Sequence, residues 1–589
     1  MHSGINERAS QRVEKLLAEF KDVHVLARRD LAVYKQQFTM GWELPGLCCS
    51  SQFKFRLLIS AGFPYDPPRV AVWPIPPVLS WPHLEENGLL CLLSEHDKHS
   101  IDVDIESDVI KLLESAVKLV TAGIAGGNAK DFEDEFLNYW VYWTKTKNAG
   151  LIYSLCCSEG PSRWVIARHG KNLLLIGDDE QAVLRWMKNR YGEDNITKIK
   201  LQRIPLLWLP RALQPNEYPS TVGALLAVTN KMGVDSQMVM QLVKDEDLQY
   251  KSVLLGFRGR TGAGFAGLRI STPSKPVKNG FRQMPPDKYL LARYKGVSVF
   301  GAMINRLDAP WIHGRDHNPQ QTVLGGKSVI IFGVGSVGSS VAELLAKSGA
   351  GKLTLVDPEL LSSENISRHV LGVTSIGTSK AVELSRVLAA RYPHLEIVGH
   401  QKSITAYASE TPAALLSADL IISTIGSWRT ESWLNALAVT SVSFPPVLYG
   451  WAEAHAAAGH AAVFLSNKGC LRCLTDDVGN VKTPVTSWSE HGTLLPVPAC
   501  GGQFQPYGAV ELSHIHSLVA DLALDVLLGR AAKSKHNVWV GHRKLLEGVN
   551  KGSWSQAWVS LHGDPGDGSF IKEIDTVSDP SCNQCGTKK

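Results

Sequence analysis

The spacing of apolar residues divides the chain into three parts with different patterns. Apolar residues recur at helical spacing between positions 13 and 20, and the stretch 53–63 (FKFRLLISAGF) then alternates with the period of a strand. A Pro-rich passage over 64–82 precedes a second helical pattern over 109–119. This order predicts a helix, a meander of strands, a loop and a closing helix, which together form an α+β domain over residues 1–155.

The remaining patterns predict two further domains. Residues 156–295 mix short strand-like runs with one helical pattern near 180–191, and frequent Pro and Gly residues interrupt them. This pattern indicates either a compact connecting domain or a long ordered linker. From residue 296 to 589 the order becomes strand, Gly-rich turn, helix, strand and helix, which predicts a doubly wound, Rossmann-like α/β domain.

Composition excludes several classes of protein. The chain has 589 residues, 44% of them hydrophobic and 20% charged, as expected for a folded protein with more than one core. Its net charge of +5 is small and its basic residues are scattered, so a direct nucleic-acid partner is not expected. Prolines, a glutamate and histidines interrupt the most apolar stretch, Val439–Ser466, which excludes a membrane span.

The cellular compartment bears on the cysteines. The first residues show no secretory signal, so we expect a cytoplasmic protein. In a reducing compartment the 10 cysteines should be thiols or metal ligands rather than disulfides. Their spacing is therefore informative.

A glycine-rich turn in the third part predicts a nucleotide site. The apolar strand over 329–332 is followed by Gly333, Gly335 and Gly338, then by an amphipathic helix and a second strand that ends at Asp357. Glycines allow backbone amides at a helix N-terminus to approach phosphate closely, and an acid after the second strand holds ribose. This fingerprint alone fits NAD, FAD and ATP equally.

Three further polar residues follow at ordered spacing. Asn365 lies three residues before Arg368, and Lys380 opens the next helical pattern. With Asp357 and the glycine turn, this stretch resembles the adenylating domain of the ThiF-type and ubiquitin-activating superfamily, in which such residues surround ATP. The resemblance implies that Arg368 and Lys380 balance the negative charge that develops when a carboxylate attacks the α-phosphorus. The other interpretation of these two cations is a solvated helix face.

The resemblance is incomplete at the magnesium site. After the strand in ADLIIS the family usually carries an aspartate that holds Mg²⁺, but this chain reads Thr-Ile-Gly-Ser over 424–427. The candidate substitutes are Asp476 and Asp477, whereas Asp419 is interpreted as structural. The protein ligand of Mg²⁺ therefore stays open.

An arginine from upstream of the glycine turn is a further family feature. In family members it reaches the phosphates, often across a dimer. Arg306 and Arg315 both lie at the corresponding place in this sequence. The resemblance does not decide between them.

Two cysteine pairs predict a metal site. Cys470 and Cys473, like Cys582 and Cys585, have the C-x-x-C spacing that places two thiolates on one tetrahedral zinc ion. In many members of the family that this chain resembles, such a zinc site holds the C-terminal segment in place. A site with four protein ligands is closed to substrate, so its role would be structural.

Cys500 is a candidate nucleophile. It lies in an apparent Gly-rich loop just before a long apolar helical pattern. In the resembling family the corresponding crossover loop carries the cysteine that takes the adenylated C-terminus as a thioester, and a thiolate suits that attack. The alternative is an inert core cysteine, the commoner state of a single thiol.

The first domain carries a second candidate nucleophile. Gly88, Cys91 and Leu92 match the Gly-x-x-Cys-Leu arrangement of the ubiquitin-conjugating fold, which this region resembles. The Asp-Pro-Pro sequence over 66–68 matches the prolines that follow the strand in that family. The resemblance implies that Cys91 accepts an acyl group; the alternative is a buried small hydrophobe. The family's His-Pro-Asn triplet is replaced by Trp-Pro-His, so His83 is a candidate for the missing oxyanion donor.

Together these features predict a relay of four steps. ATP activates a partner protein's C-terminus as an acyl-adenylate, Cys500 displaces AMP, Cys91 receives the acyl group, and a target amine attacks it. Such fusions resemble bacterial enzymes of the CBASS anti-phage systems, which join a cyclic-nucleotide synthase to targets. The resemblance implies a cGAS-like nucleotidyltransferase or a ubiquitin-like protein as the activated partner, a target protein amine, and a homodimer.

Two other functions remain open. One is an adenylyltransferase for a sulfur-carrier or ubiquitin-like protein in cofactor biosynthesis, which would need no Cys91. The other is a non-catalytic regulator that binds ubiquitin-like proteins. The missing magnesium aspartate favours the regulator.

Overall fold

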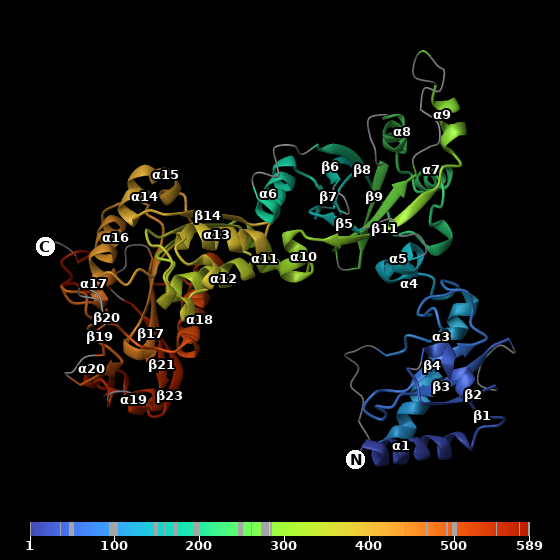
Figure 1. Ribbon diagram of the computed structural model, residues 1–589, viewed down its shortest axis with the longest axis horizontal. Helices are drawn as coiled ribbons and strands as arrows, with labels where there is room; N and C mark the ends of the chain where they lie inside the picture. The colour runs from blue at the N-terminus through green and yellow to red at the C-terminus, as the bar shows by residue number, and fades with distance from the viewer. Residues whose placement is uncertain are drawn as a thin grey trace.

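The computed structural model shows three bodies, each built on its own sheet (Figure 1). It describes residues 2–35, 37–45, 52–93, 104–145, 151–157, 159–169, 173–192, 200–245, 251–260, 262–271, 282, 286–441, 443–465, 469–489, 493–496, 503–548, 551–576 and 578–586. Cys500 lies outside these residues. Among the described helices, none combines the length and the apolar character needed to cross a membrane.

The first domain is a 4-stranded antiparallel meander in the order β1-β2-β3-β4. Phe55 and Leu57 of β3 pack with α1 and α3, whereas Leu58 packs with Tyr34 in a second cluster, so both faces of the sheet are covered. The elements are α1 (His2–Leu17), β1 (His24–Val25), α2 (Arg28–Leu31), η1 (Ala32–Tyr34), β2 (Met40–Leu44), β3 (Lys54–Ile59), β4 (Arg69–Trp73) and α3 (Ile105–Ala125).

The connecting part is a closed barrel with the strand order β10-β11-β5-β7-β6-β8-β9. The barrel includes β5, which precedes residue 155, and β11, which follows residue 295. Its elements are α4 (Asp131–Asp134), α5 (Phe136–Lys145), β5 (Leu151–Ser154), β6 (Arg163–His169), β7 (Leu173–Gly177), α6 (Glu180–Tyr191), β8 (Gln202–Leu209), η3 (Pro215–Glu217), α7 (Val222–Lys231), α8 (Gln237–Lys244), β9 (Lys251–Gly259), β10 (Gly262–Ile270), α9 (Asp287–Tyr294) and β11 (Val299–Arg306).

Helix α5 bridges the first domain and the barrel. The Trp140 indole N–H donates to the carbonyl of Ala302 in β11 at 3.1 Å, and Phe136 belongs to the apolar core of the barrel. On the same helix the Tyr139 hydroxyl accepts a hydrogen bond from the backbone of His83 in the first domain at 3.1 Å. The environment of His83 is therefore completed by a helix that also packs on the barrel.

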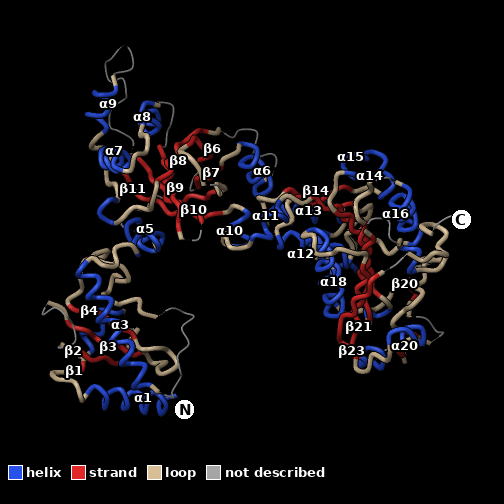
Figure 2. The backbone as a smooth tube through the Cα atoms, turned by 180° about the vertical axis from the view of Figure 1, so that it is seen from behind, coloured by secondary structure: helices blue, strands red, loops and turns tan. Residues whose placement is uncertain are grey.

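The third domain is an 8-stranded sheet in the order β14-β13-β12-β15-β16-β17-β21-β23. The strands from β14 to β16 are parallel, and β17, β21 and β23 continue the sheet as antiparallel strands. Helices α12 and α18 contribute to the core on one face, and α14 and α16 to the core on the other (Figure 2). The predicted doubly wound α/β domain is confirmed.

The elements of this domain form three groups along the chain. The nucleotide-fold half comprises α10 (Ala309–Gly314), α11 (Pro319–Gly325), β12 (Ser328–Phe332), α12 (Ser336–Ser348), β13 (Lys352–Val356), η4 (Ser363–Arg368), η5 (Val373–Ser375), α13 (Lys380–Arg391), β14 (Glu396–His400), α14 (Ile404–Glu410), α15 (Pro412–Leu416), β15 (Leu420–Ser423) and α16 (Trp428–Thr440). The middle comprises β16 (Val447–Ala452), η6 (Ala454–Ala456), β17 (Ala458–Phe464), α17 (Leu471–Leu474), β18 (Thr486–Ser487), β19 (Leu495–Pro496), β20 (Gln503–Phe504) and α18 (Ala509–Leu527). The end comprises β21 (Lys535–His542), α19 (Arg543–Gly548), β22 (Ser553–Trp554), α20 (Gln556–His562) and β23 (Gly568–Asp575).

Candidate functional site

The glycine turn after β12 is tight because it packs against a neighbouring loop. Gly333 has φ +80°, and a Cβ on it would lie 2.9 Å from the Cα of Ile425. A Cβ on Gly338, in the first turn of α12, would lie 1.9 Å from the carbonyl oxygen of Gly333. Gly335 is the N-cap of α12, and a Cβ there would meet nothing within 4 Å. Two glycines thus allow the turn to fold, and the third leaves open space in front of the helix.

Asp357 at the end of β13 is buried and holds the turn in place. Its carboxylate accepts the N–H of Val334 at 2.9 Å and the N–H of Glu359 at 2.8 Å. Burial raises the pKa of this carboxyl, and the two backbone donors oppose that rise. The carboxylate therefore connects the glycine turn to the loop that follows β13.

A cavity of about 390 Å³ opens at the carboxyl ends of β12, β13 and β15. This is the switch point at which doubly wound sheets bind ligands. Of the predicted residues, Gly333, Gly335 and Asp357 line it. The cations Lys402 and Arg429 also line it, although sequence reasoning did not select them. Lys402 follows β14, and Arg429 lies in the first turn of α16. This position next to a predicted strand or helix start is the sequence feature that could have identified them.

The other predicted residues of the nucleotide site lie around this cavity rather than in its wall. Lys380 is buried and its ammonium lies 2.6 Å from the carboxylate of Glu359, a wall residue. The Arg368 guanidinium lies over the ring of Tyr507, 4.9 Å from its centre. The side chain of Asn365 accepts the hydroxyl hydrogen of Ser362 at 2.9 Å and so caps its own short helix.

The three aspartates considered for the magnesium site all have structural partners. Asp419 accepts from Lys327 at 2.9 Å and from the N–H of Ser328 at 2.8 Å, as its structural interpretation requires. Asp476 accepts two backbone N–H groups of its own turn, and Asp477 pairs with Arg472. Asp476 and Asp477 are not among the residues that line the cavity.

A buried glutamate lies beneath the loop where the family aspartate would stand. The Glu431 carboxylate accepts the hydroxyl hydrogen of Ser423 at 2.8 Å, and the backbone amides of Ile425 and Gly426 also donate to it. Burial raises the pKa of Glu431 to about 7. The carboxyl therefore fixes the path of the chain from β15 into α16.

The two candidate arginines differ in environment. Arg306 is buried at the end of β11, where Asp308 accepts from its Nε at 2.8 Å and Asp316 accepts from its Nη2 at 2.9 Å. Its Nη1 also donates to the carbonyl of Ala263 at 2.9 Å. Arg315 is exposed and ends α10 with φ +48°. Arg306 is therefore held in buried ion pairs, whereas the side chain of Arg315 is exposed to solvent.

The four cysteines of the two pairs converge. The sulfurs of Cys470, Cys473, Cys582 and Cys585 all lie within 4.8 Å of one another, with 3.6 Å between Cys470 and Cys582 and 3.3 Å between Cys473 and Cys585. Four sulfurs about 2.3 Å from a tetrahedral zinc ion would be separated by about 3.8 Å. The donor set therefore fits zinc.

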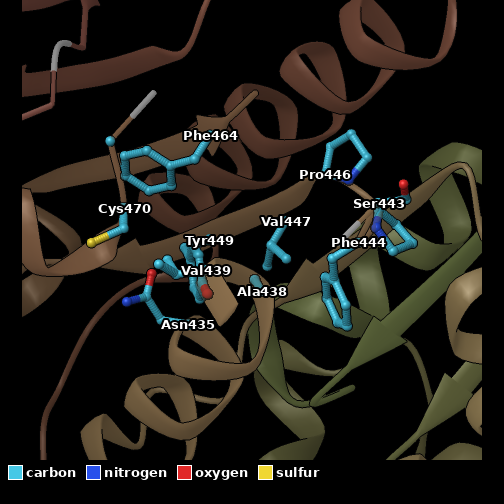
Figure 3. A pocket seen from close by; sticks show the side chains of 12 residues that line it. Asn435, Ala438, Val439, Ser443, Phe444, Pro446, Val447, Tyr449, Phe464 and Cys470 are labelled. Atoms are coloured by element: carbon cyan, nitrogen blue, oxygen red, sulfur yellow. The ribbon is translucent and has the colours of Figure 1, made fainter. Parts of the chain in front are cut away.

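Asn435 of α16 connects the cysteine cluster to the sheet. Its side-chain oxygen accepts the N–H of Leu471 at 2.8 Å, and its amide nitrogen donates to Gln584 at 2.6 Å. Figure 3 shows the pocket of about 190 Å³ beside the cluster, with Cys470 and Asn435 on one side and Phe444 on the other. The C-terminal segment is thereby connected to α16 and α17.

Cys91 is exposed at the end of a short hairpin that extends the first sheet. Leu84 and Leu90 form an antiparallel bridge, and Gly88, with φ +82°, turns the chain between them. The N–H of Cys91 donates to the carbonyl of His83 at 2.9 Å, which places these two residues opposite each other. The hairpin thus presents a thiol at the surface beside an imidazole.

The described segments before and after Cys500 contact two neighbouring residues of the chain, Glu453 and His455. Before the loop, the Glu453 carboxylate accepts the N–H groups of Val485 and Thr486 at 2.7 and 2.8 Å. After the loop, the His455 ring lies 2.8 Å from the carbonyl of Pro506. Glu453 and His455 both follow directly after β16, so both segments contact the chain at the same end of that strand.

Two family models match separate parts of the chain. Residues 313–539 match the ThiF family, and residues 19–149 match prokaryotic E2 family B. The second match includes Cys91 and its hairpin. The first includes the glycine turn, the cavity and the first cysteine pair.

Curated relatives match over most of the chain. The ATP-dependent ubiquitin transferase-like protein Cap2 of Pseudomonas aeruginosa is 26% identical over 495 residues, which cover 79% of this chain and 83% of that protein. Cap2 of Vibrio cholerae is 22% identical over 494 residues, with coverages of 75% and 80%. The adenylyltransferase and sulfurtransferase MOCS3 of Dictyostelium discoideum is 28% identical over 195 residues, only 33% of this chain and 44% of that protein.

A solved structure, the crystal structure of E. coli MccB with ATP, is 19% identical and covers 46% of this chain and 71% of that one, with a TM-score of 0.33. A likeness of this size supports no statement about the site. The two family matches and the Cap2 matches carry the assignment. The chain is a fusion of a ubiquitin-conjugating-like domain with a ThiF-type, ubiquitin-activating-like adenylating domain.

Proposed function

We propose that this protein uses ATP to activate the C-terminus of a partner protein and transfers it to a target amine. The observation that carries the proposal is the presence, in one chain, of a ThiF-type nucleotide cavity and an exposed cysteine in an E2-like domain. Tethering the two modules raises the effective concentration for transfer between their cysteines. Cap2 proteins, named as ATP-dependent ubiquitin transferase-like, share this arrangement over most of their length.

In the adenylating step ATP would occupy the cavity at the switch point. The open space at Gly335 would take phosphate at the N-terminus of α12, and Asp357 in the cavity wall would hold ribose. Lys402 and Arg429, the cations in the cavity wall, would balance the phosphate charge, together with Arg368 and with Lys380, which pairs with the wall residue Glu359. Of the carboxylates that line the cavity, Glu359 would meet the magnesium that accompanies ATP.

The acyl group would then pass through two thioesters. Cys500 displaces AMP and becomes acylated, Cys91 attacks that thioester and releases the Cys500 thiol, and a target amine forms the final amide bond. Each transfer conserves the reactive acyl bond until the amine attacks.

By resemblance, we propose a ubiquitin-like protein or a cGAS-like nucleotidyltransferase as the activated partner. We also propose a homodimer and a role in anti-phage defence in the cytoplasm.

A sulfur-carrier adenylyltransferase is less favoured because such a protein, MOCS3, matches only 33% of this chain, whereas the Cap2 proteins match over most of it. ATP–pyrophosphate exchange in the presence of a candidate partner tests the activation step. Exchange that depends on the partner's free C-terminus supports the proposed function. Absence of exchange with every candidate, while ATP itself binds, would support the non-catalytic regulator instead.

Arg429→Ala is expected to raise the KM for ATP in this exchange about tenfold, because a cation in the cavity wall is lost. The thermal transition should not change, since Arg429 is not part of the apolar core. Arg391→Ala, which removes a cation from the exposed face of α13, is the matched control and should leave the KM unchanged. An unaltered KM in Arg429→Ala would place the phosphates elsewhere.

A further inference from the structure

The hairpin that carries Cys91 also fixes an imidazole beside it. His83 and Cys91 follow the antiparallel bridge between Leu84 and Leu90, so they face each other on one side of the ladder. The backbone N–H of Cys91 donates to the carbonyl of His83 at 2.9 Å, which fixes this pairing. His83 has φ +62°, a left-handed conformation that few residues other than Gly adopt.

Two carboxylates face the same imidazole from the neighbouring helices. The Nε2 of His83 lies 3.3 Å from the Asp131 carboxylate in α4, and its Nδ1 lies 3.7 Å from the Glu135 carboxylate at the start of α5. The Tyr139 hydroxyl donates to Glu135 at 3.2 Å and accepts the backbone N–H of His83 at 3.1 Å. Two carboxylates thus contact the ring and Tyr139 binds the backbone of His83, and all three residues lie 48 or more positions away in the sequence.

The charge balance at this site favours the imidazolium form. The hydrogen bond with Cys91 raises the pKa of His83, partial burial lowers it, and the carboxylates of Glu135 and Asp131 raise it further. Among the described residues, Tyr142 also lies near Cys91, and Glu85 and Glu86 lie near Tyr142. Imidazolium next to a thiol stabilises the thiolate, which is the form that attacks a thioester and the form that leaves when an amine attacks.

We propose that His83 and Cys91 form a thiolate–imidazolium pair, with Asp131 and Glu135 as positioning residues that orient the imidazole. This arrangement corresponds to a cysteine–histidine–carboxylate triad rather than to the His-Pro-Asn loop that the sequence lacks. Its role in acyl transfer rests on the proposed function. The ion pair itself does not.

The proposal assigns each proton in the two transfers. In loading, the Cys91 thiolate, whose proton is held by His83, bonds through its sulfur to the acyl carbon, the bond from that carbon to the Cys500 sulfur breaks, and the released Cys500 thiolate takes up a proton from water. In discharge, the amine nitrogen bonds to the acyl carbon and gives its proton to water, while the Cys91 sulfur leaves as a thiolate beside the imidazolium. No oxidant or reductant is needed.

Alkylation of the full-length chain by iodoacetamide, without ATP or partner, tests the ion pair. The modified fraction at Cys91 is measured by peptide mass spectrometry between pH 5.5 and 9.5. His83→Asn is the main variant because Asn tolerates the left-handed backbone at this position. At pH 6.5 it is expected to react about tenfold more slowly than the wild type, with equal rates at pH 9.5, where the thiol ionises unaided.

A second variant keeps the test decisive if His83→Asn perturbs the hairpin. Asp131→Asn combined with Glu135→Gln retains the hydrogen-bonding shape and removes both charges, and it should slow alkylation at pH 6.5 about threefold. Asp134→Asn, an exposed carboxylate on the same helix, is the matched control and should behave as the wild type. Wild-type rates at pH 6.5 in folded His83→Asn overturn the proposal.

The outcomes separate this inference from the proposed function. A chain that shows the pH-dependent alkylation but never carries an acyl group on Cys91 refutes the function and leaves the ion pair standing. A chain that loads Cys91 with acyl group while His83→Asn alkylates like the wild type refutes only the ion pair.

Discussion

A Gly335→Val variant is expected to fold like the wild type and to lose ATP–pyrophosphate exchange about 100-fold, equivalent to about 2.7 kcal/mol. Folding should survive because a Cβ at Gly335 meets no atom within 4 Å and its φ is −76°. Exchange should fail because that open space belongs to the cavity, at the N-cap of α12, where phosphate is proposed to lie.

The control for this variant is Gly296→Val. A Cβ at Gly296 also meets nothing within 4 Å. This residue lies in the loop before β11 and is not among the residues that line the cavity. It should retain full exchange. If Gly335→Val binds and exchanges ATP as well as the wild type does, the phosphate position is wrong.

Loss of the metal from the cysteine cluster should have the second large effect. Elemental analysis of the purified wild type is expected to find one zinc per chain. Cys582→Ser should abolish that content and lower the thermal transition of the adenylating domain by about 10 °C, because zinc would hold the 578–586 segment against α17 and α16.

Cys157→Ser is the matched control, because it removes an exposed thiol in the connecting part. It should keep both the zinc and the thermal transition of the wild type. A wild-type protein that contains no zinc when purified without chelators, yet melts at the same temperature as Cys582→Ser, would contradict a structural metal site.

Local chemistry explains which parts of the site sequence patterns could predict. The turn over 333–338 and Asp357 belong to one strand–turn–helix–strand unit, so their spacing along the chain specifies their geometry. The same holds for each C-x-x-C pair. Lys402 and Arg429 enter the cavity through the order of strands in the sheet, which apolar periodicity does not encode.

Long-range pairing explains what could not be predicted. The barrel closes by pairing β5 with β11, strands separated by more than 140 residues, and the Pro and Gly breaks between them gave no sign of closure. His83 was selected only as a loop residue or oxyanion donor, because Asp131 and Glu135 reach it from helices whose sequence pattern shows no relation to the hairpin.

The most direct test of the account is intact mass spectrometry of Cys91→Ala and Cys500→Ala, incubated with ATP, magnesium and a candidate partner under non-reducing conditions. The relay predicts that Cys91→Ala accumulates a dithiothreitol-sensitive adduct of the partner on Cys500 and that Cys500→Ala accumulates none. If Cys91→Ala instead forms finished conjugates as well as the wild type does, the conjugating role of Cys91 is wrong.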